Sequence, residues 1–123
     1  MLGIFKNQGT TAQNVGYSSY VALLSQTGTD APSQIVLNNT ISDSNILWQY
    51  TGVGIYTGTL SGAFITNKTT AIINPISDSG TGDLCGVFIV NENTIIVSTT
   101  TQTTITPKDE VLFNTKLEIT VYP

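Results

Sequence analysis

The side chains able to carry acid–base chemistry are three carboxylates near the C-terminal end. Asp109 and Glu110 are adjacent in a turn-forming segment, and Glu118 alternates with apolar residues. A glycosidase needs two carboxyl groups across a cleft, roughly 5 to 9 Å apart. Nothing in the sequence pattern sets two of these groups across a cleft, so we interpret all three as charges on solvent-facing surfaces.

Residue type excludes several other catalytic classes. The chain has no histidine, and reading it shows that its four basic residues are Lys6, Lys68, Lys108 and Lys116. Histidine-based zinc sites, Ser-His-Asp triads and arginine-finger phosphoryl transfer are therefore excluded. The single cysteine, Cys85, lies in the apolar run LCGVFIV, which favours a small buried side chain over a reactive thiol. We expect no enzyme activity and no cofactor.

One segment has the oxygen-rich character of a calcium loop. Ser77 to Asp83 reads SDSGTGD and offers two carboxylates, Asp78 and Asp83, with glycines between them. The segment lacks the Asp-x-Asp-x-Asp spacing and the closing glutamate of known calcium loops. An ordinary solvated turn is the favoured interpretation, and we expect no metal. Calcium binding is the alternative.

Three aromatic residues could form a stacking platform for sugar rings. Trp48, Tyr50 and Tyr56 offer apolar ring faces with polar edges, which suits carbohydrate binding. Trp48 and Tyr50 share one strand face with Ile46, because successive side chains of a strand point to opposite sides. That pattern favours the hydrophobic core over a ligand platform.

The charge balance bears on the kind of partner. Charged residues make up 10% of the chain, against about a quarter in average globular proteins, and the formal net charge is −4. We expect no nucleic-acid binding, because phosphate neutralisation needs clustered lysine and arginine. No apolar run approaches the roughly 18 residues that span a bilayer, and the start MLGIFKNQGTT does not resemble a secretory signal. We therefore expect no membrane partner.

These residues are positioned by strands and turns. Two alternating segments, Ile46–Thr51 and Ile55–Leu60, flank Gly52, Val53 and Gly54, which predicts a β-hairpin that reverses at the glycines. Further strands are predicted at Tyr17–Gln26, Gln34–Asn39, Thr70–Ile76, Leu84–Val90, Thr94–Thr99 and Leu117–Val121. The threonine-rich stretch Thr99–Thr106 has high β propensity and is expected to continue its strand.

This pattern of short strands and turns predicts an all-β fold. We expect an antiparallel β-sandwich of about eight strands, for which a jelly-roll-like topology is one option and a small barrel the alternative. Residues 17–123 form the single β-sandwich domain, and residues 1–16 form an extended N-terminal arm. The arm has few large apolar groups, so it is either mobile or docked on a neighbouring chain. Its candidate partner-binding residues are Leu2, Ile4 and Phe5.

Several segments resemble those of a group of small β-rich proteins. They are YVALLSQTGTDAP at Tyr20–Pro32, VLNNTI at Val36–Ile41, Trp48, GIYTGTLSGAF at Gly54–Phe64, NKT at Asn67–Thr69 and EITVYP at Glu118–Pro123. Proteins of this group are encoded among the virion genes of tailed phages that infect Bacteroidetes, including crAss-like phages. The resemblance covers about half of the chain and leaves out Ser77–Thr106. It is a pattern of strands and turns and brings no catalytic residues with it.

The resemblance implies a structural role in the virion. The expected function is that of a capsid auxiliary or decoration protein, which binds the shell or itself through the N-terminal arm. A head-fibre or tail-associated module and a carbohydrate-binding module for host adhesion are the alternatives. The implied partners are the major capsid protein or another virion protein, together with further copies of the chain in a homo-oligomer such as a trimer. The chain would then be made in the host cytoplasm and would act in the virion.

Overall fold

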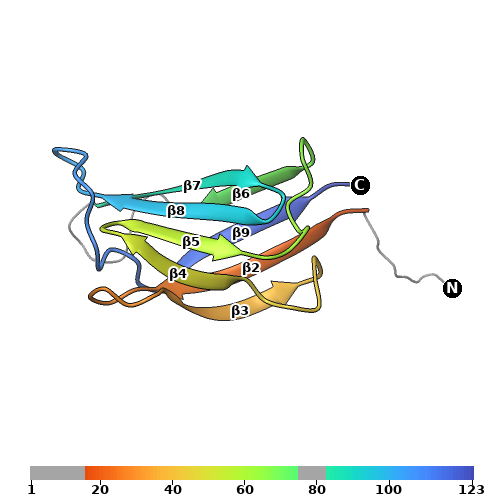
Figure 1. Cartoon of the computed structure of the whole chain (residues 1–123), viewed down its shortest axis with the longest axis horizontal. Coiled ribbons are helices and arrows are strands. Elements are labelled where there is room, and N and C mark those ends of the chain that lie inside the picture. Colours follow the sequence, from red (N-terminus) through yellow and green to blue (C-terminus); the bar gives the residue numbers. More distant parts are fainter. Residues whose placement is uncertain (1–15, 75–82) are drawn as a thin grey trace, which may run out of the picture.

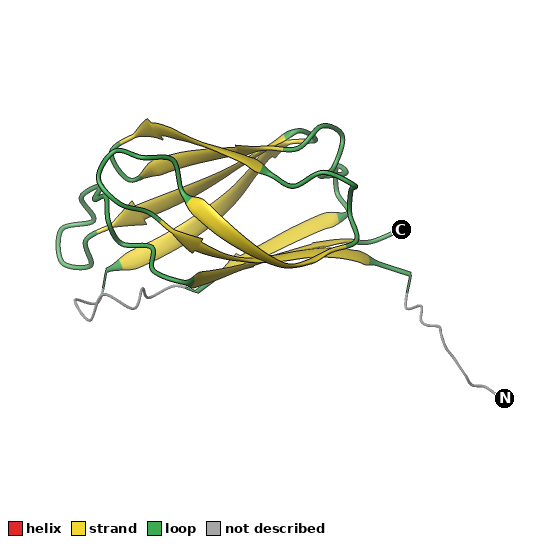
Figure 2. Ribbon diagram, turned by 90° about the horizontal axis from the view of Figure 1, so that it is seen from below, coloured by secondary structure: helices red, strands yellow, loops and turns green. Residues whose placement is uncertain are grey.

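Alternation of buried and exposed side chains builds two antiparallel sheets that pack face to face. The computed structural model describes residues 16–74 and 83–123. One sheet has the order β3-β2-β9-β6 and the other β4-β5-β8-β7 (Figures 1 and 2). The strand bounds are β2 Ser18–Ser25, β3 Ser33–Asn39, β4 Leu47–Gly52, β5 Ile55–Thr59, β6 Thr69–Ile73, β7 Leu84–Asn91, β8 Thr94–Thr100 and β9 Thr115–Val121. The predicted all-β sandwich is confirmed.

The C-terminal strand β9 lies at the centre of its sheet. It pairs with β2 on one side and with β6 on the other. The predicted alternation is confirmed, because Leu117 and Ile119 are fully buried while Lys116 faces solvent. The same face of β2 and the inner face of the second sheet complete the core with Tyr20, Ala22, Leu24, Tyr56, Ile95 and Val97.

The β4–β5 hairpin forms as predicted, and one of its two glycines has a special backbone conformation. Gly54 has φ +66°, and a Cβ there would lie 2.8 Å from the amide nitrogen of Lys108. Only glycine fits this position, because L side chains rarely adopt that φ and the backbone of a neighbouring segment is too close. Gly52 has no positive φ and instead ends β4 at a register shift opposite Ile55.

The expected extension of β8 through Thr106 is wrong. The strand ends at Thr100, and a single bridge to Pro107 closes a loop over residues 101–106. The amide of Thr101 donates to the carbonyl of Thr106, and the Thr106 amide lies 3.2 Å from the Thr101 hydroxyl. Threonine hydroxyls that bond to nearby backbone groups compete with sheet ladders, which explains why a β-prone composition makes a loop here.

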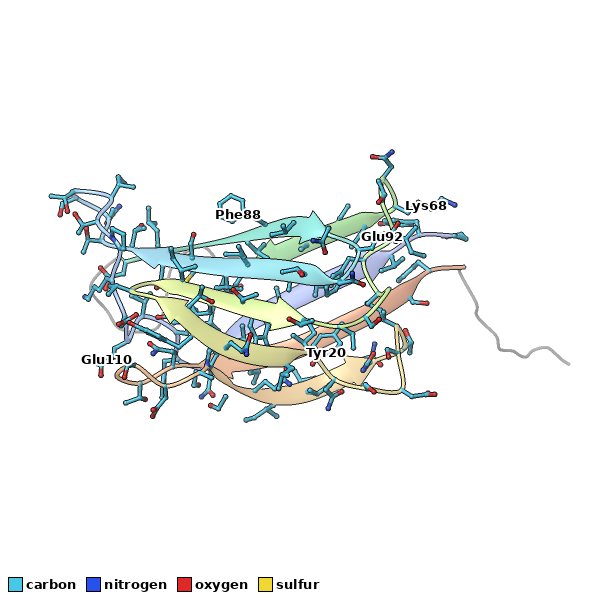
Figure 3. All side chains as sticks on the ribbon, viewed as in Figure 1. Tyr20, Lys68, Phe88, Glu92 and Glu110 are labelled. Carbon is cyan, nitrogen blue, oxygen red and sulfur yellow. The ribbon has the colours of Figure 1, made fainter. Side chains whose placement is uncertain are left out.

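The sandwich has two distinct ends (Figure 1). We call one the terminus end, because β2 begins and β9 finishes there and the Tyr17 and Tyr122 rings lie 5.8 Å apart. The loops 40–46 and 60–68 and the β7–β8 turn lie at the same end. We call the opposite end the loop end, where the β2–β3 turn, the β4–β5 turn and the segment 101–114 meet. Figure 3 shows Glu110 at the loop end and Lys68 with Glu92 at the terminus end.

Candidate interaction surface

Trp48 lies in the core and is held there by a polar network. Its side chain is 6% exposed, and its indole N–H donates to Oε1 of Gln34 at 3.0 Å. The hydroxyl of Tyr20 donates to the same oxygen at 2.7 Å and accepts from the amide of Ile46 at 3.1 Å. The amide group of Gln34 donates to the Ile46 carbonyl at 2.8 Å. These bonds join the two sheets between β3, β2 and β4, so the indole is part of the scaffold.

Tyr50 and Tyr56 converge on one carboxylate at the loop end. Asp109 accepts hydrogen bonds from the Tyr50 hydroxyl at 2.7 Å, the Tyr56 hydroxyl at 3.0 Å and the Gly54 amide at 2.7 Å. Tyr56 is fully buried and Tyr50 packs against the core. Because Trp48 and Tyr56 are buried, the three rings form no sugar platform, and the interpretation of Trp48 as core is confirmed.

The ionisation of this cluster follows from its contacts. Burial raises the pKa of Asp109, but hydrogen bonds from the Gly54 amide and the two tyrosine hydroxyls outweigh burial and leave its pKa below the usual value. Burial, with a further contribution from Asp109, raises the pKa of Tyr56. The hydrogen bond to Asp109 raises the pKa of Tyr50. At neutral pH the cluster is therefore one carboxylate held by neutral tyrosines.

Gln26 connects this cluster to the neighbouring loops. Its Oε1 accepts from the Tyr56 hydroxyl at 2.9 Å and from the Glu110 amide at 2.8 Å. Its Nε2 donates to the carbonyls of Gly28 and Asp30. The carboxylate of Glu110 accepts from the Gly28 amide at 2.8 Å. Asp109 and Glu110 thus act as loop anchors, and Glu118 lies apart on β9 with its Oε1 3.7 Å from Nζ of Lys116.

Asp83 is buried beside a lysine. Its carboxylate lies 2.7 Å from Nζ of Lys108, and the residue is 4% exposed. The remaining residues of the segment 77–83, for which a solvated turn was expected and calcium binding was the alternative, lie outside the described residues. Cys85 is partly buried against the core, and burial together with Asp83 raises the pKa of its thiol to about 11. A thiol that stays protonated at neutral pH is a weak nucleophile.

The described part of the chain, residues 16–74 and 83–123, has no pocket and no group of three histidine, cysteine or acidic side chains that could hold a metal ion. It also contains no helix of the length and apolar character needed to cross a membrane.

Exposed apolar side chains gather on the outside of the first sheet. Ile35 and Leu37 of β3 are each 57% exposed, and Ile35 pairs with Leu23 of β2. A bulge between Val36 and Asn38 puts Leu37 beside Val21. We call Val21, Leu23, Ile35 and Leu37 the outer apolar face. Lys116 and Glu118 of β9 lie next to it in the sheet, so the face is apolar with a charged border, as in protein-binding surfaces.

A second exposed apolar region is the strand β7. Phe88 is 58% exposed, Val90 53% and Ile89 36%, in a strand that pairs only with β8 among the described residues. Figure 3 shows the Phe88 ring standing off β7, away from the body of the sandwich. The run LCGVFIV predicted a strand but not its position at the edge of a sheet, which is where three consecutive apolar side chains become exposed.

The predicted partner-binding residues Leu2, Ile4 and Phe5 lie outside the described residues, so their prediction is neither confirmed nor contradicted. The functional features that the sequence interpretation missed are the outer apolar face and the glutamines of the two polar networks, Gln26 and Gln34. The apolar alternation of Ile35 and Leu37 was visible in the sequence, but it did not tell which side of the strand another sheet covers.

Comparison of the chain with protein-family models, with curated proteins and with solved structures found no match in any of the three.

Proposed function

We propose that the chain is a virion structural protein, most simply a capsid auxiliary or decoration protein that attaches to the shell of a tailed phage. The observation that carries the proposal is the outer apolar face. Ile35 and Leu37 stand on a regular sheet and are more than half exposed. Exposed apolar clusters with polar borders are characteristic of surfaces that bind other proteins.

The start of the described chain adds to the proposal. Residue 16 lies two positions before Ser18, the first residue of β2, and β2 contributes Val21 and Leu23 to the outer apolar face. A shell protein that binds this face could therefore also contact the arm residues Leu2, Ile4 and Phe5. Because residue 16 lies at the terminus end (Figure 1), a shell bound there would leave the loop end pointing away from it.

The surface chemistry is compatible with an assembly protein. Charged residues are 10% of the chain, and threonines occupy exposed strand positions, as at Thr51 and Thr59. The resemblance to virion proteins of Bacteroidetes phages supports the same class, with the major capsid protein as the expected partner and a homo-oligomer as the expected form. A head-fibre or tail-associated module shares this support. The carbohydrate-binding alternative loses its support, because Trp48 and Tyr56 are buried.

The proposal is tested on particles purified from cells infected with the phage that encodes this chain. Mass spectrometry is expected to find the chain in the particles at a fixed ratio to the major capsid protein. Each apolar side chain buried in a contact contributes about 1.5 to 3 kcal/mol. The combined substitution Leu2→Ser, Ile4→Ser and Phe5→Ser is therefore expected to lower incorporation at least about tenfold.

A matched control changes polar residues of the same arm. The combination Asn7→Ser, Gln8→Ser and Thr10→Ser is expected to leave incorporation unchanged. A second variant, Ile35→Ser with Leu37→Ser, tests the outer apolar face and is expected to lower incorporation. Particles without the chain would contradict the virion role. Unchanged incorporation of both apolar variants would contradict the proposed attachment.

A further inference from the structure

Strand β7 is an edge strand that has a register shift only at its end, between Ile89 and Asn91, and is otherwise regular. Proteins guard such edges with charges, prolines, bulges or very short strands. The edge strand β3 has a bulge in its middle, β4 ends in a register shift, and β6 has only five residues. In β7 the register with β8 runs unbroken from Leu84 to Ile89, and no residue of that stretch is charged or proline.

The hydrogen bonds of β8 show which backbone groups of β7 face the open edge. The amide of Thr99 donates to the carbonyl of Gly54, and the carbonyl of Thr99 accepts from Lys108, so both groups point away from β7. Cys85 lies opposite Thr99. In an antiparallel ladder, hydrogen-bonded and non-hydrogen-bonded pairs alternate. The N–H and C=O groups of Cys85, Val87 and Ile89 therefore face away from β8, at an edge where no second strand among the described residues pairs with β7, although β6 of the other sheet lies near it.

The side chains of β7 are complementary to those of a second β7 in antiparallel orientation. Around a two-fold axis through Val87, Val87 pairs with itself and Cys85 pairs with Ile89, and these are the residues whose backbone groups face outward. Phe88 then lies beside Gly86 of the second copy in a non-hydrogen-bonded pair, in which side chains approach most closely. An aromatic ring covering a cross-strand glycine is a favourable sheet contact.

Other two-fold registers are less favourable. An axis through Phe88 would bring two Phe88 rings together and place each Gly86 opposite Val90. An axis through Gly86 would bring two glycines together and place the charged Asp83 opposite Ile89. Because Leu84–Ile89 has no charge, no register brings a charge next to its own copy.

We propose that two copies of this chain pair through β7, antiparallel about a two-fold axis at Val87, so that two four-stranded sheets become one continuous sheet. An isologous contact of this kind closes after two copies. The arm plays no part in the contact, so this inference goes beyond the proposed virion function and stands or falls separately from it.

The first test measures the mass of the purified full-length chain by sedimentation velocity over a range of concentrations. At about 100 µM, where contacts of micromolar affinity are formed, the expected mass is twice the monomer mass of 13.1 kDa. The variant Phe88→Ser is expected to be monomeric. Its matched control is Ile72→Ser, which changes another exposed apolar residue of an edge strand, 66% exposed on β6, and is expected to remain dimeric.

A second test exchanges the large and small residues of the contact. Gly86→Phe is expected to fold, because a Cβ at this position meets only Ser98 Oγ at an ordinary 3.5 Å. The variant is expected to be monomeric, because the new phenylalanine at position 86 would meet Phe88 of the second copy. Gly86→Phe combined with Phe88→Gly restores one large and one small residue per pair. This double variant is expected to recover the dimer, with circular dichroism confirming the fold of each variant.

A third test needs no substitution. Hydrogen exchange followed by NMR is expected to show slow exchange of the Val87 amide at high concentration and fast exchange on dilution, while the Phe88 amide, which faces β8, stays protected at both concentrations.

Several outcomes would overturn the inference. They are a wild-type chain that is monomeric at about 100 µM, a trimer in place of a dimer, a folded Phe88→Ser variant that remains dimeric, and a folded exchange variant that fails to recover the dimer. A dimer lost in the combined Leu2→Ser, Ile4→Ser and Phe5→Ser variant would also overturn it, because the contact would then depend on the arm. None of these outcomes bears on whether the chain is incorporated into particles.

Discussion

Asp109 is the residue that joins the separate loops of the loop end. Its three donors come from β4, from β5 and from the turn between them, while the following residue, Glu110, reaches the β2–β3 turn. A carboxylate that accepts several hydrogen bonds in a partly buried site is strongly favoured in its ionised form. The stability of this end of the sandwich therefore depends on one ionised side chain.

Replacing Asp109 is expected to destabilise the fold in a pH-dependent way. Asp109→Asn removes charge-assisted acceptance from two tyrosines and an amide, which is expected to cost about 1 to 3 kcal/mol of unfolding free energy at pH 7. The folded-state pKa lies below the unfolded value of about 3.9. Ionised Asp109 thus stabilises the fold above pH 4 or so, and this contribution disappears as the pH falls through the folded-state pKa.

Urea unfolding at pH 7 and at several lower pH values measures this effect. The difference between the wild type and Asp109→Asn is expected to shrink as the pH falls below about 4. Asp43→Asn, in the exposed loop at 40–46, is the control and is expected to change stability by less than about 0.5 kcal/mol. A difference that stays constant with pH would contradict the role given to the ionised carboxylate.

Ile105 is a strained residue in the threonine-rich loop. It has φ +51° and is 63% exposed. A β-branched residue in the left-handed region is a conformational outlier that costs about 1 to 2 kcal/mol. Asparagine tolerates this region better, so Ile105→Asn is expected to raise the unfolding free energy by about 0.5 to 1 kcal/mol. A lower melting temperature for the variant would contradict the strain.

At the scale of elements, two strand glycines on either side of β8 have opposite roles. Gly58 in β5 pairs with Ile95, and a Cβ there would lie 2.7 Å from Ile46 Cγ2 and 2.9 Å from Trp48 Cζ3. Gly86 in β7 has room for a Cβ. The absence of a side chain at Gly58 therefore makes space for the indole of Trp48.

Substitution of these glycines is expected to separate packing from backbone effects. Gly58→Ala is expected to destabilise the fold by about 1 to 3 kcal/mol, because it overpacks the core. Gly86→Ala makes the same chemical change in a strand and is expected to leave stability unchanged or raise it by up to about 1 kcal/mol. Thermal unfolding of both variants checks the difference. Equal losses would mean that the close packing at Gly58 is not the cause.

The central strand β9 is expected to be the element whose stability contribution suffers most when a buried side chain is shortened. Leu117 is fully buried, whereas Ile72 of the neighbouring strand β6 is 66% exposed. Leu117→Ala is expected to cost about 2 to 5 kcal/mol through lost burial and the cavity left behind. Ile72→Ala, on the outside of the same sheet, is expected to change stability by less than about 0.5 kcal/mol. Urea unfolding of the two variants makes this comparison directly.

At the scale of the whole molecule, the two ends of the sandwich carry different features. The start of β2 and the end of β9 share one end, while the loops that Asp109 holds together form the other (Figure 1). If the outer apolar face and the β7 edge both bind, the antiparallel contact at β7 would point the loop ends of the two copies in opposite directions. The partners would then meet different sides of the molecule, because the two surfaces belong to different sheets.

The sandwich is expected to fold without the arm. All strands of the described core lie between residues 18 and 121. A chain starting at Gly16 is therefore expected to unfold at the same temperature as the full chain, within about 2 °C, and to give the same near-ultraviolet circular dichroism. A large drop in melting temperature would mean that residues 1–15 belong to the folded domain and would contradict the predicted division of the chain.

The sequence by itself determined where most strands and turns lie, because these depend on local properties. Alternation along Leu117, Ile119 and Val121 has a period of two wherever one face of a strand is buried, and Gly54 supplies a backbone conformation that other residues avoid. Each of these patterns involves residues that are only a few positions apart in the sequence. The wrong prediction of a strand through Thr99–Thr106 also has a local cause. The β propensity of these residues is outweighed by hydroxyl groups that bond to the nearby backbone.

Only the tertiary structure decided which faces and edges are exposed. Alternation separates the two faces of β3, but the position of the second sheet determines that Val36 points inward while Ile35 and Leu37 face solvent. The run LCGVFIV becomes an edge because, among the residues that the structure describes, only β8 pairs with β7. Likewise, Asp109 gains its partners from Tyr56, 53 residues away in the chain. Contacts over such separations depend on strand order, which local sequence patterns do not contain.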